Sequence, residues 1–121
     1  MATKSYRDLV VWQRAMQLVV AVYEITGQFP PEERFGLTSQ MRRAAVSIPS
    51  NIAEGYQRHS RKEYVHFLTI AFASGAELET HVELSKRLPQ LLKLDYNSVD
   101  GFLLETMKLL NVNIARLREA S

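Results

Sequence analysis

The sequence predicts an all-α fold, an antiparallel up-down four-helix bundle, from three observations. Apolar residues recur at steps of three and four in four separate stretches of the chain. Proline or glycine follows each of the first three stretches, and no stretch has the alternating pattern of a β-strand. The connections are short, so consecutive helices can pack against each other.

Length and composition support one globular domain over residues 1–121, because 46% of the residues are hydrophobic and 23% are charged. The absence of cysteine excludes a disulfide framework, a thiolate metal site and a cysteine nucleophile. Near the N-terminus the longest apolar run, Leu18 to Tyr23, is too short for a signal peptide or a membrane span. We therefore expect a cytoplasmic protein with no membrane partner.

The first predicted helix starts at Leu9 and carries two apolar seams, although one stripe is enough for a surface helix of a monomer. The first seam comprises Leu9, Trp12, Met16, Val19 and Tyr23. The second comprises Val11, Ala15, Leu18, Val22, Ile25 and Phe29. We expect this helix to pack on two sides, with Trp12 and Tyr23 at an interface between subunits. Phe29-Pro30-Pro31 is expected to end it.

The second predicted helix spans about Leu37 to Ala53, with Pro49 inside it and Gly55 as its stop. Because the apolar spacing continues beyond Pro49, the proline is expected to kink the helix near Ala45 rather than end it. The fold prediction is therefore a bundle with a proline-kinked second helix.

A polar face follows the same helix, and it has two interpretations. It is either a solvated surface with an internal Arg–Glu network or a polar interface between subunits. The residues assigned to the interface are Ser47, Ser50, Asn51 and Glu54.

The third predicted helix begins at a capping box, Ser60-Arg61-Lys62-Glu63, in which the serine and the glutamate each satisfy a free amide. Leu88-Pro89 is expected to close it. The fourth helix is expected to begin between Asp95 and Ser98, either of which can cap it.

Two carboxylate–imidazole pairs have the spacing of metal ligands. Carboxylate-bridged metal bundles need two Glu-x-x-His motifs and two further glutamates, and the chain has one such motif, Glu63 to His66. For Glu77 and His81, one turn apart, we expect a partly buried histidine beside a carboxylate. Since the sequence also lacks a phosphate loop and a nucleophile elbow, we expect no enzyme, no catalytic residue, no metal and no cofactor.

Positive charge is concentrated in residues 42–62, where five cations face one acid, Glu54, for a local charge of +4 in a chain of net charge +2. Such a cluster is either a solvated face or the footprint of a polyanion. We hypothesise that these cations bind nucleic acid with little sequence specificity, because no sequence-reading module is visible. They are Arg42, Arg43, Arg58, Arg61 and Lys62. The alternative is a protein-interaction scaffold with no nucleic-acid role.

The run from Arg42 to Gly55, with its Ser-Ile-Pro-Ser-Asn-Ile-Ala-Glu-Gly core, resembles the signature of a bacterial protein family. These are the four-helix-bundle proteins first noted as open reading frames in intervening sequences of 23S rRNA genes. Matching pieces elsewhere are Leu9-Val10-Val11-Trp12, Gly36-Leu37 and Ala76-Glu77-Leu78-Glu79, so that the likeness covers roughly residues 6–110. At Phe72-Ala73-Ser74 the chain departs from the family, which more often has glycine before the serine.

The resemblance implies an up-down bundle that assembles into a ring-like homo-oligomer, with a homopentamer favoured. Relatives include the accessory protein of diversity-generating retroelements, a basic pentamer that binds nucleic acid and a reverse transcriptase. By this resemblance, the partners to consider are further copies of the chain, RNA or DNA, and a protein such as a reverse transcriptase.

Overall fold

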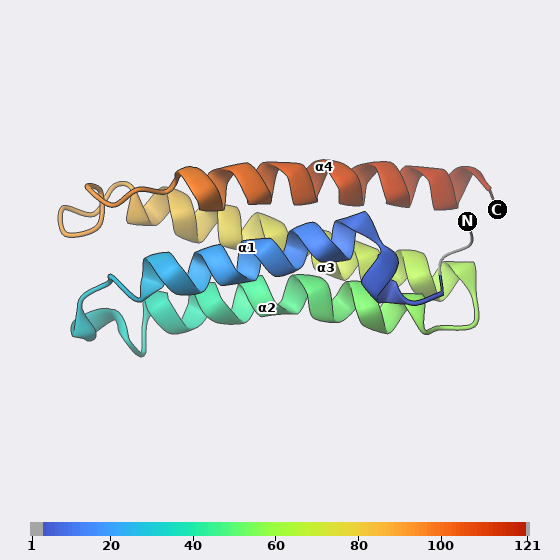
Figure 1. Ribbon diagram of the computed structural model, residues 1–121, viewed down its shortest axis with the longest axis horizontal. Helices are drawn as coiled ribbons and strands as arrows, with labels where there is room; N and C mark the ends of the chain where they lie inside the picture. Colours follow the sequence, from blue (N-terminus) through green and yellow to red (C-terminus); the bar gives the residue numbers. More distant parts are fainter. Residues whose placement is uncertain (1–3, 121) are drawn as a thin grey trace.

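Four α-helices make up most of the computed structural model, which describes residues 4–120 and has no strand among them. Their bounds are α1 (Val10–Thr26), α2 (Leu37–Tyr56), α3 (Arg61–Ser85) and α4 (Asn97–Glu119). Two short 3₁₀ helices, η1 (Tyr6–Asp8) and η2 (Pro31–Glu33), precede α1 and α2. The α-helices lie side by side, and consecutive helices run in opposite directions (Figure 1). The predicted four-helix bundle is confirmed.

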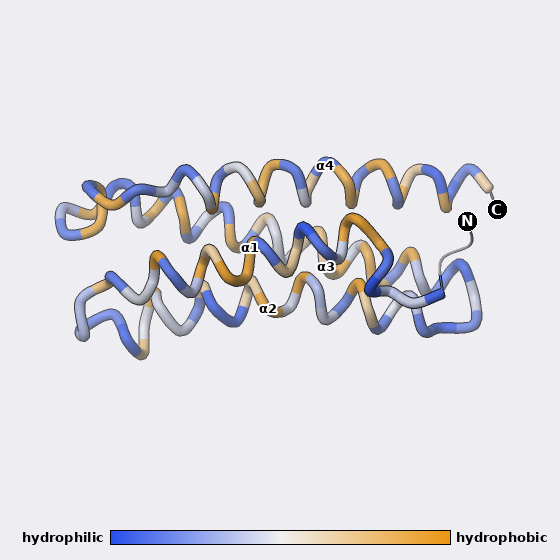
Figure 2. Tube along the Cα trace, viewed as in Figure 1, coloured by the Kyte–Doolittle hydropathy of each residue, from blue (hydrophilic) through white to orange (hydrophobic). Residues whose placement is uncertain are grey.

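One face of each helix supplies the core, and polar positions alternate with these apolar ones along every helix (Figure 2). The second seam of α1 is buried along its whole length, whereas Met16 and Tyr23 of the first seam are exposed. The largest fully buried side chains include Leu18, Met41, Ile48, Ile52, Leu68, Leu78, Leu91 and Leu110. No helix in the described part of the chain combines the length and the apolar character needed to cross a membrane.

The helices α1 and α3 both end a few residues before the prolines that were expected to stop them. Beyond Thr26, the amides of Gln28 and Phe29 bond to the carbonyls three residues earlier. Beyond Ser85, Arg87 and Leu88 do the same. In both places the chain therefore leaves the α-helix through tighter 3₁₀-type turns, so the proline lies outside the helix that it delimits.

The helix α2 is continuous through Pro49, as the apolar spacing predicts, and its bend stays a prediction. Two side chains after the proline donate hydrogen bonds to carbonyls before it. The Ser50 hydroxyl donates to the Val46 carbonyl and the Asn51 amide side chain to the Ser47 carbonyl, each at 2.8 Å. The prediction that Gly55 stops the helix is wrong, because α2 continues to Tyr56.

Gly55 serves the contact between α2 and α3 instead. A Cβ atom at this position would lie 2.7 Å from the Cβ of Phe67 and 3.2 Å from the carbonyl oxygen of Tyr64. The residue is buried, so the missing side chain is what lets the two helices approach each other here.

The start of α3 agrees with its predicted serine cap, whereas α4 begins within the predicted range but has Tyr96 at its N-cap position, with no side-chain cap hydrogen bond. Ser60 precedes α3, and its hydroxyl accepts a hydrogen bond of 3.1 Å from the Glu63 amide. Asp95 precedes α4, and its carboxylate accepts a hydrogen bond of 2.9 Å from the Asn97 amide, at the first residue of the helix. Side-chain acceptors thus satisfy amides that the helices themselves leave free.

Candidate nucleic-acid interface

The bundle divides the five predicted cations between two surfaces. Arg42 and Arg43 lie in the first half of α2, near the turn that joins it to α1. Arg58, Arg61 and Lys62 lie at the other end of the molecule, where α2 passes into α3. Fourteen residues of α2 lead from Arg42 to the helix end at Tyr56, which is about 21 Å at the rise of an α-helix, and Arg58 follows two residues later. One basic segment of sequence therefore becomes two basic surfaces of a single chain.

The first surface, which we call the arginine cleft, is a cavity of about 500 Å³ beside the α1–α2 turn. Three arginines, two aromatic residues and two hydroxyl residues line it, and no acidic residue does. The lining residues are Tyr23, Arg34, Phe35, Thr38, Ser39, Arg42, Arg43 and Val46.

Arg42 is held in place by α1. Its Nε donates a hydrogen bond of 2.8 Å to the hydroxyl of Thr26, and its guanidinium lies 4.4 Å from the ring centroid of Tyr23. Thr26 in turn donates to the Val22 carbonyl at 2.6 Å. The Arg42 Nη2 also donates, at 3.4 Å, to the Tyr23 carbonyl. Because a guanidinium has five N–H donors, further donors remain for a ligand, and Arg42 contributes a fixed, half-buried positive charge to the cleft.

The other two arginines of the cleft are exposed. Arg43 lies 3.6 Å from the Glu77 carboxylate of α3, a distance and exposure at which an ion pair contributes little. The Arg34 guanidinium lies 5.4 Å from the ring centroid of its neighbour Phe35, whose side chain is 88% exposed. The cleft therefore combines positive charge with two aromatic rings, each paired with an arginine.

At the second surface, which we call the basic end, two of the three cations have partners within the chain. Arg58 pairs with Glu54 at 2.9 Å and lies 4.7 Å from the ring centroid of Phe67. Arg61 donates to the Ala120 carbonyl at 2.5 Å. Lys62 is exposed and borders a cavity of about 310 Å³ with Arg61, Val65, Leu117 and Arg118. The expected Arg–Glu pair of the α2 polar face thus forms between Glu54 and Arg58.

The polar residues assigned to a subunit interface fall into two groups. Ser47 and Asn51 are half-buried. Ser47 joins α2 to α3 through a 2.9 Å hydrogen bond with Ser74, and within α2 it accepts one of 3.0 Å from Asn51. Ser50 and Glu54 are exposed. A role for these four residues between subunits stays a prediction.

The aromatic residues assigned to that interface lie along α1. Trp12 is half-buried, packs edge-to-face on Tyr6 at 5.3 Å between ring centroids, and lines a groove of about 330 Å³ between α1 and α2. Tyr23 is exposed at the arginine cleft. Their contact with another subunit likewise stays a prediction.

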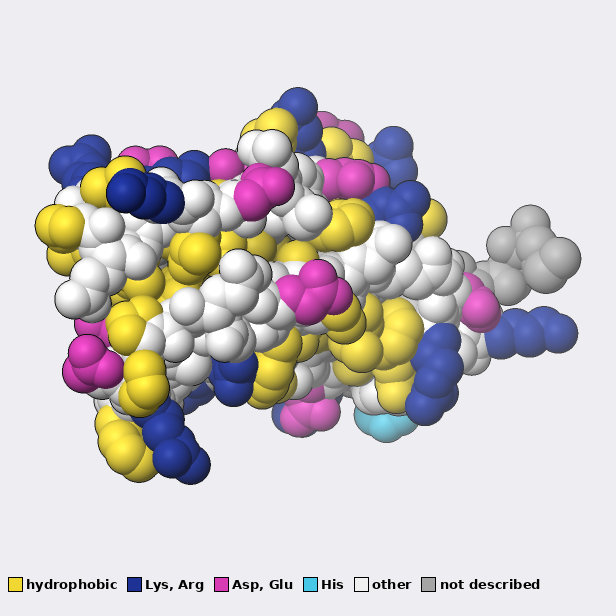
Figure 3. Space-filling view, turned by 60° about the vertical axis from the view of Figure 1, so that its left-hand side comes forward, with side chains coloured by type: hydrophobic (Ala, Val, Ile, Leu, Met, Phe, Trp, Pro, Cys, Tyr) yellow, Lys and Arg dark blue, Asp and Glu magenta, His cyan; other side chains and the backbone are white. Residues whose placement is uncertain are grey.

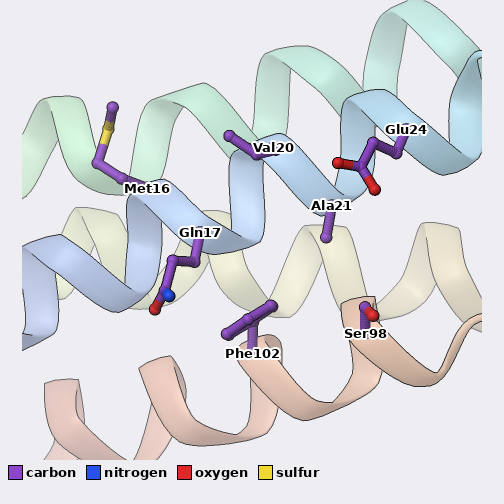
Figure 4. Close-up of a pocket in the computed structure, with 7 residues that line it drawn as sticks. All are labelled: Met16, Gln17, Val20, Ala21, Glu24, Ser98 and Phe102. Atoms are coloured by element: carbon purple, nitrogen blue, oxygen red, sulfur yellow. The ribbon is translucent and has the colours of Figure 1, made fainter.

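Along its outer side, α1 also leaves apolar side chains in contact with solvent. Those of Val10, Met16, Val20 and Tyr23, which we call the α1 apolar surface, are 39% to 55% exposed. A groove of about 350 Å³ borders this surface on its α4 side, where Gln17 and Ala21 of α1 lie across from Phe102 of α4 (Figure 4). Figure 3 shows hydrophobic side chains reaching the surface along the length of the molecule.

His81 lies buried beside Glu77, as the sequence predicts, with 3.7 Å between its Nε2 and the carboxylate. Its Nδ1 has no hydrogen-bond partner. Burial lowers the pKa of His81; the charge of Glu77 opposes this effect, and that of Arg43 adds to it. Within residues 4–120, no three His, Cys, Asp or Glu side chains are grouped to hold a metal ion.

Sequence reasoning missed Arg34 and Phe35, which complete the arginine cleft. Two acids, Glu32 and Glu33, precede them and cancel the local charge, so no basic cluster is visible around residue 34. The signal that remained was an aromatic residue outside every helical seam, which on its own does not distinguish the exposed Phe35 from the buried Tyr96. Only the pairing of α1 with α2 shows that it lies beside Arg42 and Arg43.

Comparison with known proteins places the chain in a family. A family model described as 23S rRNA-intervening sequence protein matches residues 7–112. The fold is similar to the crystal structure of a protein of unknown function from the S23 ribosomal protein family of Bacteroides thetaiotaomicron VPI-5482, with a TM-score of 0.79 and 28% identity over 88% of this chain and 96% of that one. A search of curated proteins found no match. Since the family model covers most of the bundle, including the run from Arg42 to Gly55, the chain belongs to the 23S rRNA-intervening sequence protein family.

Proposed function

We propose that this protein is a non-enzymatic homo-oligomer that binds the phosphates of nucleic acid through its arginine cleft, with little sequence specificity. The observation that carries the proposal is the composition of the cleft, three arginines with no acid among the lining residues. A guanidinium presents a planar fork of donors that matches the oxygens of a phosphate. Contacts to phosphate position a protein on nucleic acid without reading its sequence.

The two surfaces differ in how much charge they offer to a ligand. At the basic end, Glu54 neutralises Arg58, and Arg61 is bonded to the backbone of α4. In the cleft, Arg42 is oriented by neutral groups and Arg34 packs against a ring, whereas Arg43 lies 3.6 Å from the Glu77 carboxylate, farther than the 2.9 Å of the Arg58–Glu54 pair. The cleft is therefore the stronger candidate, and the basic end is an auxiliary contact.

Charge removal at matched positions tests the assignment. The variant Arg34→Gln with Arg43→Gln removes two cations from the cleft and keeps Arg42, which ties α2 to α1. The control variant, Arg61→Gln with Lys62→Gln, removes the same charge from the basic end. Fluorescence anisotropy with labelled RNA and DNA of unrelated sequences is measured at several salt concentrations, and circular dichroism checks that both variants fold.

We expect the cleft variant to lose about tenfold or more in affinity for every sequence. Its plot of log affinity against log salt is expected to flatten by about 1.4 to 1.8, because each of the two lost phosphate contacts removes about 0.7 to 0.9 from the slope. The control variant is expected to change less on both counts. Equal losses in the two variants would refute the cleft as the site, and no binding by the unmodified protein at low salt would refute the function.

A second candidate function is a protein-interaction scaffold, and the α1 apolar surface favours it. Exposed apolar surface of this extent marks contact sites more often than ordinary solvent-facing helix. If the protein binds no nucleic acid and is a monomer, this surface is best explained by a different protein partner, of which a reverse transcriptase is the example that the resemblance suggests.

A further inference from the structure

The exposed ring of Phe35 gives the arginine cleft a property that phosphate binding alone does not need. A phenyl side chain that is 88% exposed contributes almost no burial to folding. It cannot bind phosphate, yet it lies among three arginines. We propose that the cleft takes single-stranded nucleic acid, with one unpaired base stacked on Phe35. This inference rests on the proposed function and names its substrate class.

The position of Arg34 supports a stacking role. Its guanidinium lies on one face of the Phe35 ring, 5.4 Å from the centroid. Since the side chain is otherwise exposed, the opposite face is open to a ligand. A flat base on that face would complete a stack of guanidinium, ring and base, an arrangement that tolerates any base because every base has a π face.

The remaining residues of the cleft fit the backbone of the same strand. Arg42, fixed by Thr26 and Tyr23, and the exposed Arg43 supply charge next to the ring. The volume of about 500 Å³ lies within the range of pockets for small ligands, roughly 300 to 1,000 Å³. The cleft is thus large enough for a nucleotide unit of a strand.

A duplex would use the cleft poorly, because its bases are paired and stacked on each other. A base must leave the helix before a side chain can stack on its face. Duplex binding would therefore depend on the arginines alone, whereas single-strand binding would depend on the arginines and Phe35 together.

The variant Phe35→Ala tests this division, with Leu92→Ala as a matched control because Leu92 is another exposed apolar residue in the connection at the same end of the bundle, 49% exposed. Phe35→Trp tests whether a different aromatic ring at the same position keeps the affinity for the single strand. Anisotropy is measured with a labelled single strand of about 12 nucleotides, a length within known single-strand site sizes, and with the blunt duplex of the same sequence. Uridine monophosphate and polyglutamate serve as competitors, and light scattering gives the mass of each variant.

We expect Phe35→Ala to lose about tenfold in affinity for the single strand, with the salt slope and the duplex affinity unchanged, and Phe35→Trp to restore the single-strand affinity. Leu92→Ala is expected to behave as the unmodified protein. If Phe35→Ala binds the single strand normally while the cleft arginine variant does not, the inference fails and the proposed function stands. If the unmodified protein binds neither probe, both fail.

Three other outcomes would also overturn the inference. A lower mass for Phe35→Ala would assign the ring to a subunit contact. Equal competition by polyglutamate would assign the cleft to acidic polymers in general. Displacement of the strand by an equal concentration of uridine monophosphate would assign it to free nucleotides.

Discussion

His81 is a buried base whose Nε2 faces a carboxylate beyond hydrogen-bond distance and whose Nδ1 is unpaired. Glu77 is 3.7 Å from its Nε2, Arg43 adds a nearby positive charge, and Nδ1 has no hydrogen-bond partner. Removing a buried polar atom that lacks a partner costs little, because its desolvation is not compensated in the folded state. The residue therefore affects stability mainly through its protonation.

The sign of the pH dependence follows from the lowered pKa of His81. Because burial lowers the pKa in the folded chain, the unfolded chain, with a pKa near the usual 6.5, binds the proton more readily. The contribution to stability is complete above about pH 6.5 and is lost as the pH falls from there through the folded-state value. We expect His81→Leu to lose less stability than the unmodified protein between about pH 7.5 and pH 5.5 in urea unfolding. Identical losses in the two proteins would contradict this assignment.

The sequence is least informative about which individual side chains bond to each other. An Arg–Glu network is one of the two interpretations that the sequence allows for the α2 polar face, and Glu54 does pair with Arg58, four residues along the chain and just beyond the end of α2. Arg42 bonds instead to Thr26, sixteen residues earlier on another helix. No local spacing encodes that contact, since it depends on how α1 and α2 are rotated against each other.

At the scale of the helices, two glycines allow close contacts that a side chain would prevent. A Cβ on Gly55 would overlap α3 at Phe67 and the Tyr64 backbone, whereas a Cβ on Gly75 would overlap the sulfur of Met107 on α4. The Met107 side chain can move aside, and the backbone of Tyr64 cannot. Gly55 is therefore the more restrictive of the two positions.

Substitution of glycines by alanine measures this difference. Gly101, in α4, has no atom within 4 Å of an added Cβ, so Gly101→Ala is expected to stabilise the protein by about 0.5 to 1 kcal/mol through helix propensity. Gly55→Ala gains the same propensity but is expected to be destabilised by about 1 to 3 kcal/mol overall, because the helices must separate. Urea unfolding of both variants gives the comparison. A stabilised Gly55→Ala would show that the α2–α3 contact is easily displaced.

Helix existence was predictable from the sequence, and helix ends were predictable only where a side chain makes the cap. Ser60 caps α3 as expected because its partner amide is three residues away. Gly55 was misassigned as a stop, since glycine is used both to end helices and to allow another helix to approach. At Gly55 the close approach of α3 explains the glycine, and the sequence around Gly55 does not show where α3 packs.

At the scale of the whole molecule, α1 has one apolar side in the core and another that is partly exposed to solvent. The second seam fills the core, and the α1 apolar surface, which combines Met16 and Tyr23 of the first seam with Val10 and Val20, has grooves toward α2 and α4 on either side. The sequence therefore predicted that α1 has two apolar sides, although it could not give the outline of the outer one. Phe102, on the far side of the α4 groove, belongs to it only because α4 packs beside α1.

Self-association through this surface is tested by a charge at its centre. Val20→Glu adds an acid one turn from Glu24 at a side chain that is 55% exposed, and Leu104→Glu makes the same change on α4 at one that is 58% exposed. We expect light scattering to give a multiple of the chain mass for the unmodified protein, five-fold if the family resemblance holds, and a smaller mass for Val20→Glu alone. A change confined to Leu104→Glu would move the interface to α4. A monomeric unmodified protein would remove the oligomer proposal.

An even number of antiparallel helices returns the chain to the end from which it started, so Lys4 and Ala120 lie at the basic end and the arginine cleft at the other (Figure 1). A molecule tethered to a support through either terminus therefore stands with the cleft pointing away, about 30 Å from the anchor along the 20 residues of α2. Tethered through a cysteine placed at the α1–α2 turn, in a chain that has no other, it stands the opposite way. Binding of nucleic acid to the support in the first orientation, and its loss in the second, would assign binding to the arginine cleft rather than to the basic end. This comparison changes no charged residue.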